Sequence, residues 1–171
     1  MFKSISNWIS PKHRQASAWA RAAYVNLVKE ARNPRFYTDS HVPDTEDGRF
    51  DMVLLHVAIE TWGLLQRNPP EKLKAQALFD ALFLDMDMAL RQIGVGDLGI
   101  PHHMRRMFKL YKGRCYAYAE ALTQNNRALL TEVITRNIYR KVENVPENIV
   151  AQVADYVEAR AREAASLREA A

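Results

Sequence analysis

The sequence predicts an all-α protein with a single compact domain of six or seven helices. Apolar residues recur at helical spacing through most of the 171 residues, and no segment shows the apolar–polar alternation of a strand. Proline and glycine occur between these segments, where helix ends are expected. The stretch at about 70–93 is apolar over most of its helical circumference. We therefore predict that it forms the central helix, with neighbours on several sides.

Composition agrees with a soluble globular domain. Apolar residues make up 48% of the chain and charged residues 26%. No run approaches the roughly 18 consecutive apolar residues that a membrane span requires. The single cysteine, Cys115, excludes an internal disulfide and fits a reducing compartment. We expect a buried thiol there rather than a nucleophile.

The net charge of +4 is concentrated near the start of the chain. Residues 1–29 contain no acid and five basic residues, which are Lys3, Lys12, Arg14, Arg21 and Lys29. This distribution indicates a local basic surface. It argues against a nucleic-acid-binding domain that is basic over its whole length.

Residues 1–10 form an amphipathic, basic N-terminal segment. One side of a helix would carry its apolar residues, Phe2, Ile5, Trp8 and Ile9. A secretory signal is disfavoured because the segment has no continuous apolar region. Three interpretations stay open: a transit peptide, ordinary packing or disorder, and peripheral contact with a membrane. In the third, the apolar side would enter the bilayer surface while Lys3 faces anionic lipid.

The helical domain is predicted over residues 11–145. Ser10 and Pro11 provide a cap and a first-turn proline for its first helix, which Asn33 and Pro34 end. The connection at 35–48 contains apolar residues that would be costly to expose, so we expect an ordered segment across the core. Asp44 or Thr45 then begins the next helix, which ends before Pro69 and Pro70.

The central helix is predicted to stop at Gly94, with a positive φ angle. Pro101 begins a basic helix. Gly113 is predicted to separate this helix from a long one that ends near Arg140. The last helix occupies residues 146–171, and its final turns are expected to project or fray.

The sequence contains no recognisable set of residues for catalysis or for metal binding. The five histidines show none of the spacings of zinc or di-iron sites. His56 lies four residues before Glu60, and we interpret it as a hydrogen-bonded core histidine. The glycines at 94, 96 and 99 match a dinucleotide-loop pattern, but a helix precedes them instead of a strand, which favours a helical corner. No cofactor, metal or catalytic set is therefore expected.

Two surface features are candidate partner sites. The predicted basic helix contains five Lys or Arg and no acid, so a counter-surface of phosphate, lipid head group or acidic protein is expected. Its candidate binding residues are Arg105, Arg106, Lys109 and Lys112. The second feature is the acidic stretch after Tyr37, in which Tyr37 and Asp39 are candidates. The alternatives are a solvated face for the first and simple helix capping for the second.

Three motifs resemble the signatures of one family. They are MD…ALRQIGVGDLGIPHHMRRM (86–107), ARNPRFYTDSHVPDTEDGRFDMVLLHVAIE (31–60) and AQALFDALFLDMD (75–87). Over about residues 15–140 the chain is similar to the ubiquinol–cytochrome c chaperones, which are assembly factors for the cytochrome bc1 complex in mitochondria and related bacteria.

The resemblance implies an all-α chaperone without catalytic residues or cofactor. Its client would be newly made cytochrome b or another bc1 subunit, and it would act in the cytoplasm at the inner face of the bacterial inner membrane, or in the mitochondrial matrix. The chain lacks the long N-terminal extension expected of mitochondrial relatives, which favours a bacterial member. A small partner protein and ribosome contact therefore stay open. The basic surface suggests an alternative function, which is binding to RNA or to the ribosome.

Overall fold

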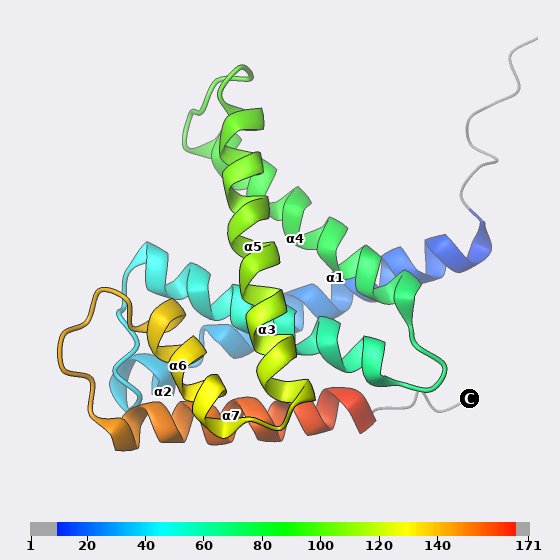
Figure 1. The fold of residues 1–171 in the computed structure, drawn as a ribbon. Coiled ribbons are helices and arrows are strands. Elements are labelled where there is room, and N and C mark those ends of the chain that lie inside the picture. Colours follow the sequence, from blue (N-terminus) through cyan, green and yellow to red (C-terminus); the bar gives the residue numbers. More distant parts are fainter. Residues whose placement is uncertain (1–9, 167–171) are drawn as a thin grey trace, which may run out of the picture.

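The computed structural model describes residues 10–166, and every regular element in that range is a helix (Figure 1). The helices are α1 (Pro11–Ala31), α2 (Pro34–Thr38), α3 (Glu46–Gln66), α4 (Lys72–Gln92), α5 (Ile100–Thr123), α6 (Arg127–Ile138) and α7 (Glu147–Ser166). The predicted all-α class is confirmed. The N-terminal residues Phe2, Lys3, Ile5, Trp8 and Ile9, and the last turns at 167–171, lie outside the described residues.

The starts of α1 and α3 follow from the local sequence. The Ser10 side chain accepts a hydrogen bond from the His13 amide at 3.4 Å, and Pro11 occupies the first turn of α1. Thr45 caps α3 by accepting from the Gly48 amide at 3.1 Å. Side-chain acceptors at these positions satisfy amides that have no partner inside the helix. The cap predicted at Ser10 is therefore confirmed, and of the two residues considered for the start of α3, Asp44 and Thr45, the cap is Thr45.

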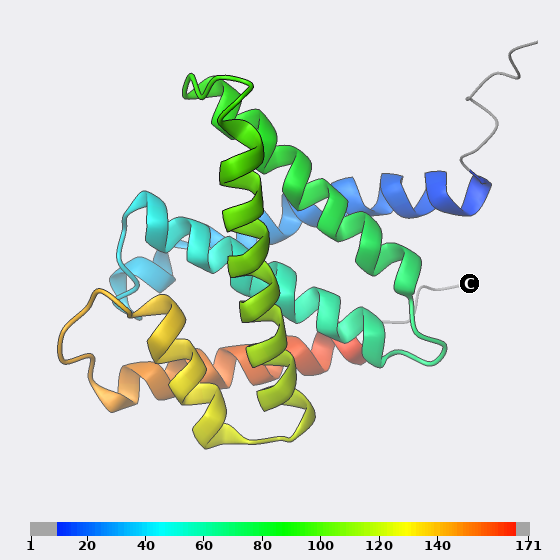
Figure 2. The ribbon, with the colours of Figure 1, turned by 45° about the horizontal axis from the view of Figure 1, so that its top comes forward.

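The centre of the domain is α3, and the prediction that the helix at about 70–93 is central is wrong. Every residue of α3 from Asp51 to Glu60 except Val53 is buried, and α1, α4, α5, α6 and α7 all pack against this helix. On α4, by contrast, Leu84 is 59% exposed and Met88 is 49% exposed. The second half of α4 extends beyond the body of the domain together with the first half of α5 (Figure 2). The spacing of apolar residues predicts that a helix has an apolar surface. It does not predict whether a neighbouring helix covers that surface.

The turn after α4 is confirmed, whereas the predicted break at Gly113 is wrong. Gly94 has a φ angle of 84°, the left-handed conformation expected of a glycine stop. Helix α5 runs without interruption through Gly113. The chain breaks instead at Asn125, whose φ is 49°, and Asn126 caps α6 by accepting from the Leu129 amide at 3.0 Å. An interior glycine lowers helix stability by only about 1 kcal/mol, which packing readily offsets.

Helix α7 lies along α3 at very short range. A Cβ atom built on Gly63 would lie 2.4 Å from the Cβ of Ala164, so only glycine fits at this crossing. Further along the interface, Glu60 forms an ion pair with Arg160 at 3.0 Å, and both Nε and Nη2 of Arg67 donate to the Ala164 carbonyl. One face of α3 is therefore closed by a packed and hydrogen-bonded helix.

Candidate functional site

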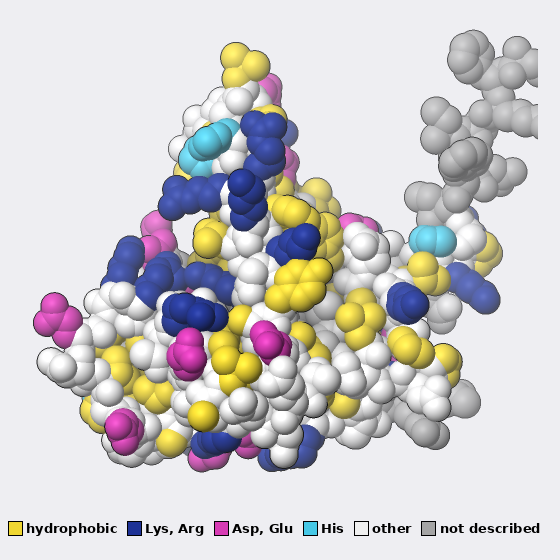
Figure 3. Space-filling view, in the orientation of Figure 1, with side chains coloured by type: hydrophobic (Ala, Val, Ile, Leu, Met, Phe, Trp, Pro, Cys, Tyr) yellow, Lys and Arg dark blue, Asp and Glu magenta, His cyan; other side chains and the backbone are white. Residues whose placement is uncertain are grey.

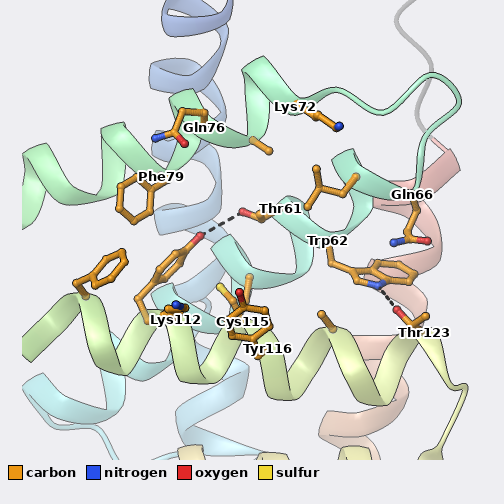
Figure 4. A pocket seen from close by; sticks show the side chains of 16 residues that line it. Thr61, Trp62, Gln66, Lys72, Gln76, Phe79, Lys112, Cys115, Tyr116 and Thr123 are labelled. Atoms are coloured by element: carbon orange, nitrogen blue, oxygen red, sulfur yellow. Dashed lines mark hydrogen bonds between the residues drawn. The ribbon is translucent and has the colours of Figure 1, made fainter.

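A groove of about 580 Å³ lies on the face of α3 opposite this closed interface, between α4 and α5 (Figure 4). Helix α3 contributes Thr61, Trp62 and Leu65. Phe79 comes from α4 and Tyr116 from α5. The groove exists because α4 and α5 meet at their hairpin and diverge towards α3, so that neither covers this part of its surface (Figure 1).

Aromatic rings form the end of the groove nearest the hairpin. The Phe79 and Phe83 ring centroids are 4.3 Å apart, and Phe79 lies 5.5 Å from the ring of Tyr111 and 6.0 Å from that of Phe108. Aromatic pairs at such distances and angles stabilise one another beyond the area that they bury. They give the groove a fixed, apolar wall.

Several apolar side chains of the groove remain open to solvent. Tyr116 is 66% exposed, Phe108 43% and Leu65 42%. Large apolar side chains that gather at one concave surface usually mark an interaction site in soluble proteins. The groove is thus the strongest candidate for binding an apolar partner.

The polar groups of the groove hold its shape. The indole Nε1 of Trp62 donates to the Thr123 hydroxyl at 3.0 Å, which ties α3 to the end of α5 (Figure 4). The Thr61 and Tyr111 hydroxyls are 3.4 Å apart. The Lys112 ammonium lies 5.7 Å from the centroid of the Tyr116 ring.

The thiol that lines the groove, Cys115, is held in its protonated form. Burial raises the pKa of this thiol to about 11. A thiol with such a pKa carries almost no thiolate at neutral pH, and the thiolate is the reactive species. Neither a carboxylate nor an imidazole lines the groove to act as its base. No residue that lines the groove is therefore placed to activate this thiol.

His56 is a hydrogen-bonded core residue, as the sequence predicted. Its Nδ1 lies 2.7 Å from the Met52 carbonyl, which accepts, and its Nε2 lies 2.7 Å from the Tyr156 hydroxyl. Burial lowers the pKa of His56, so the ring is neutral at pH 7 and its Nε2 accepts from the Tyr156 hydroxyl. Among residues 10–166, no group of three His, Cys, Asp or Glu side chains is placed to hold a metal ion.

A buried ion cluster joins residues whose pairing could not be predicted from the sequence. Asp51 pairs with Arg114 at 2.5 Å and with Arg140, and the side chains of Asp51 and Arg114 are 4% and 9% exposed. Asp51 is in α3, Arg114 in α5, and Arg140 follows α6, so the cluster joins three segments. The partners are 63 and 89 residues apart in sequence, and no local pattern connects them.

The structure divides the predicted basic site between two faces of α5. Lys112 lines the apolar groove, whereas Arg106 and Lys109 line a second pocket, between α5 and α6. Arg105 is exposed and lines neither of them. The four cations share a helix without sharing one surface.

The other two predicted residues lie at the end of α2, at the base of the molecule, away from the projecting half of α5 (Figure 1). Tyr37 is in α2, and Asp39 directly follows it. The Tyr37 hydroxyl donates to the Ala31 carbonyl at 2.7 Å, so it secures the turn between α1 and α2. Asp39 is exposed at the end of α2 and accepts from the Thr38 hydroxyl at 2.6 Å. A partner role for this pair stays a prediction.

The described residues thus form an all-helical domain with an open apolar groove, a kind of surface on which proteins bind apolar partners. Within the described chain, none of the helices has the length and hydropathy needed to cross a membrane. The family model described as Ubiquinol-cytochrome C chaperone matches residues 38–171, and the chain belongs to this family. The match includes α7, which the sequence resemblance did not reach.

A solved structure supports the same assignment. The chain is similar to the crystal structure of the Cbp3 homolog from Brucella abortus, with 31% sequence identity and a TM-score of 0.78. The similarity covers 92% of this chain and 87% of the other. The relative is a bacterial protein, in agreement with the predicted bacterial affinity. The comparison with curated protein sequences returns no match.

Proposed function

We propose that this chain is a non-enzymatic assembly chaperone for the cytochrome bc1 complex, and that its groove holds an apolar segment of newly made cytochrome b. The observation that supports the proposal is the groove between α3, α4 and α5, with Leu65, Phe108 and Tyr116 exposed along it. Membership of the ubiquinol–cytochrome c chaperone family supports the choice of complex.

The client's chemistry fits this groove. A transmembrane segment is apolar over about 20 residues, so before insertion it exposes a surface that aggregates in water. A groove between two helices accepts one face of such a helix through side chains spaced at three and four residues. The groove has no catalytic set, so it would act by covering the segment until the segment enters the membrane.

This function places the protein in the bacterial cytoplasm, at the inner face of the inner membrane. Contact with the membrane would be peripheral and reversible. Cell fractionation tests the location: the protein is expected partly in the membrane fraction at low salt and in the soluble fraction after a high-salt wash. Recovery in the soluble fraction at every salt concentration would contradict it.

Deletion of the gene is the direct test of the function. We expect the deletion strain to contain much less assembled bc1 complex, measured by the haem b and haem c absorbance of its membranes, and we expect the intact gene to restore it. Normal absorbance in the deletion strain would refute the proposal.

A further inference from the structure

The second pocket, between α5 and α6, has an unusual charge. Its volume is about 430 Å³, and no carboxylate lines it. Its polar lining consists of Arg106, Lys109, Arg114, Arg136, Asn137 and Arg140. Gly113 adds no side chain, and nothing lies within 4 Å of the Cβ position there, which leaves the pocket open at its α5 wall.

Nearby acids neutralise only part of this charge. Asp51 pairs with Arg114 and Arg140, and Arg136 reaches Glu132 at 3.4 Å on its own helix. Within residues 10–166, none of the observed ion pairs includes Arg106 or Lys109, which stand one turn apart on α5. The pocket therefore keeps a local excess of positive charge.

The guanidinium groups of the pocket have donors beyond those that their carboxylate partners use. Each guanidinium carries five N–H donors. Arg114 and Arg140 share the single carboxylate of Asp51. An anion with several oxygens, bound between α5 and α6, would offer acceptors to these guanidinium groups together.

We propose that this pocket binds the phosphate of an anionic phospholipid head group and so docks the protein on a membrane surface. Phosphate matches the chemistry, because it presents several acceptors to arginine donors. Figure 3 shows Lys and Arg side chains gathered along the upper half of α5 and again above α6, on one face of the molecule. Cationic surfaces of this kind are attracted to anionic lipid.

Apolar groups in the pocket and at the hairpin tip favour lipid over nucleic acid. Leu110 lines the pocket and is 43% exposed, and at the tip of the α4–α5 hairpin Leu98 is 99% exposed and Ile93 77%. Such side chains can enter the interface of a bilayer, whereas RNA offers them no comparable apolar environment. The pocket also has no aromatic ring on which a base could stack. Binding to the bilayer therefore accounts for both the cations and the exposed apolar tip.

Vesicle co-sedimentation of the purified full chain tests the proposal. Vesicles of phosphatidylcholine are compared with vesicles that also contain phosphatidylglycerol, and we expect binding only to the second kind. Arg106→Gln/Lys109→Gln should weaken this binding about 30-fold, because a basic residue near an anionic surface contributes about 1 kcal/mol. The matched control is Arg105→Gln/Lys112→Gln, which removes the same charge from the same helix outside the pocket and should cost at most a few-fold. Thermal unfolding verifies that both variants are folded.

Each other outcome overturns the proposal. Equal losses in the two variants would show diffuse attraction without a pocket, and equal binding to both kinds of vesicle would exclude recognition of the anionic head group. Stabilisation by inorganic phosphate without vesicle binding would assign the pocket to a free anion. Tighter binding of a single-stranded RNA than of the anionic vesicles would assign it to nucleic acid. Because the vesicles contain no client, a negative result leaves the proposed chaperone function untouched.

Discussion

Helices α3 and α4 are both 21 residues long and both carry wide apolar surfaces, yet the fold treats them differently. Every residue of α3 from Asp51 to Glu60 except Val53 is buried, and even the polar side chains Asp51, His56 and Glu60 have partners there. Helix α4 leaves Leu84 and Met88 in solvent. Apolar surface that the chain itself does not cover indicates a partner from outside it. The buried part of α3 therefore stabilises the fold, whereas the exposed residues of α4 and the exposed end of α3 at Leu65 are available to a partner.

The largest effect is expected from the buried charge on α3. Asp51→Leu leaves Arg114 buried without its counter-charge, and we predict a loss of about 3–5 kcal/mol in the free energy of unfolding, measured by urea denaturation. Asp51→Leu/Arg114→Met removes both charges and should recover most of this stability. If the double variant is as unstable as the single one, the loss does not come from the unpaired arginine.

Next comes the contact between α3 and α7. Gly63→Ala forces a methyl group to within 2.4 Å of the Ala164 side chain and 2.7 Å of its backbone, and should cost about 3 kcal/mol. Gly113→Ala is the matched control, because a methyl group at that helical position meets nothing within 4 Å and should stabilise the protein by up to about 1 kcal/mol. Equal effects of the two substitutions in urea would contradict the described close approach.

His56 makes the stability of the α3–α7 interface depend on pH. Its pKa in the folded protein is lowered by burial, so the unfolded state binds the proton more tightly. This contribution is present in full above the unfolded pKa of about 6.5 and is lost as the pH falls from there through the lowered folded pKa. We predict that the free energy of unfolding falls by about 1 kcal/mol more between pH 7.5 and pH 5.5 in the wild type than in His56→Gln. Parallel pH profiles would show that His56 titrates normally.

The smallest effect on stability belongs to the hairpin. Gly94→Ala places a β-carbon on a residue with a φ of 84°, where nothing within 4 Å adds a collision, so the cost should be about 1 kcal/mol from the backbone alone. Gly96→Ala, also free of close neighbours and without a positive φ, should change the urea midpoint little. A larger loss for Gly96→Ala would mean that this turn is held differently.

Local chemistry determined which features could be predicted from the sequence. The caps at Ser10 and Thr45 and the stop at Gly94 depend on a few adjacent residues, and all three are found in the structure. Gly113 misled because a glycine inside a helix has the same appearance in sequence as one at its end. The end of α5 could have been predicted from Asn125 and Asn126 instead. Asparagine adopts the left-handed conformation found at Asn125, and it caps helices, as Asn126 caps α6.

The candidate site depended on contacts that a single sequence does not reveal. The exposure of Leu65 and Tyr116 results from the divergence of α4 and α5 over α3, and each side chain alone looks like an ordinary core residue. The basic pocket likewise joins Arg106 on α5 to Arg136 on α6. For such features the sequence predicts the chemistry of the parts, and the packing of helices decides which parts meet.

The proposed function depends most directly on whether the open groove is needed for assembly of the bc1 complex. Leu65→Asp/Tyr116→Asp puts charge on two exposed groove positions, and Val25→Asp, at a position on α1 that is 65% exposed, is the control. Each variant gene is introduced into the deletion strain in place of the missing gene. The haem b absorbance of purified membranes then measures the amount of bc1 complex. We predict that the groove variant, folded and present at wild-type level, loses most of the complex, because a charge that must be buried against an apolar client costs several kcal/mol, while Val25→Asp restores the complex in full. Full assembly with the groove variant would contradict the central claim that this groove holds the client.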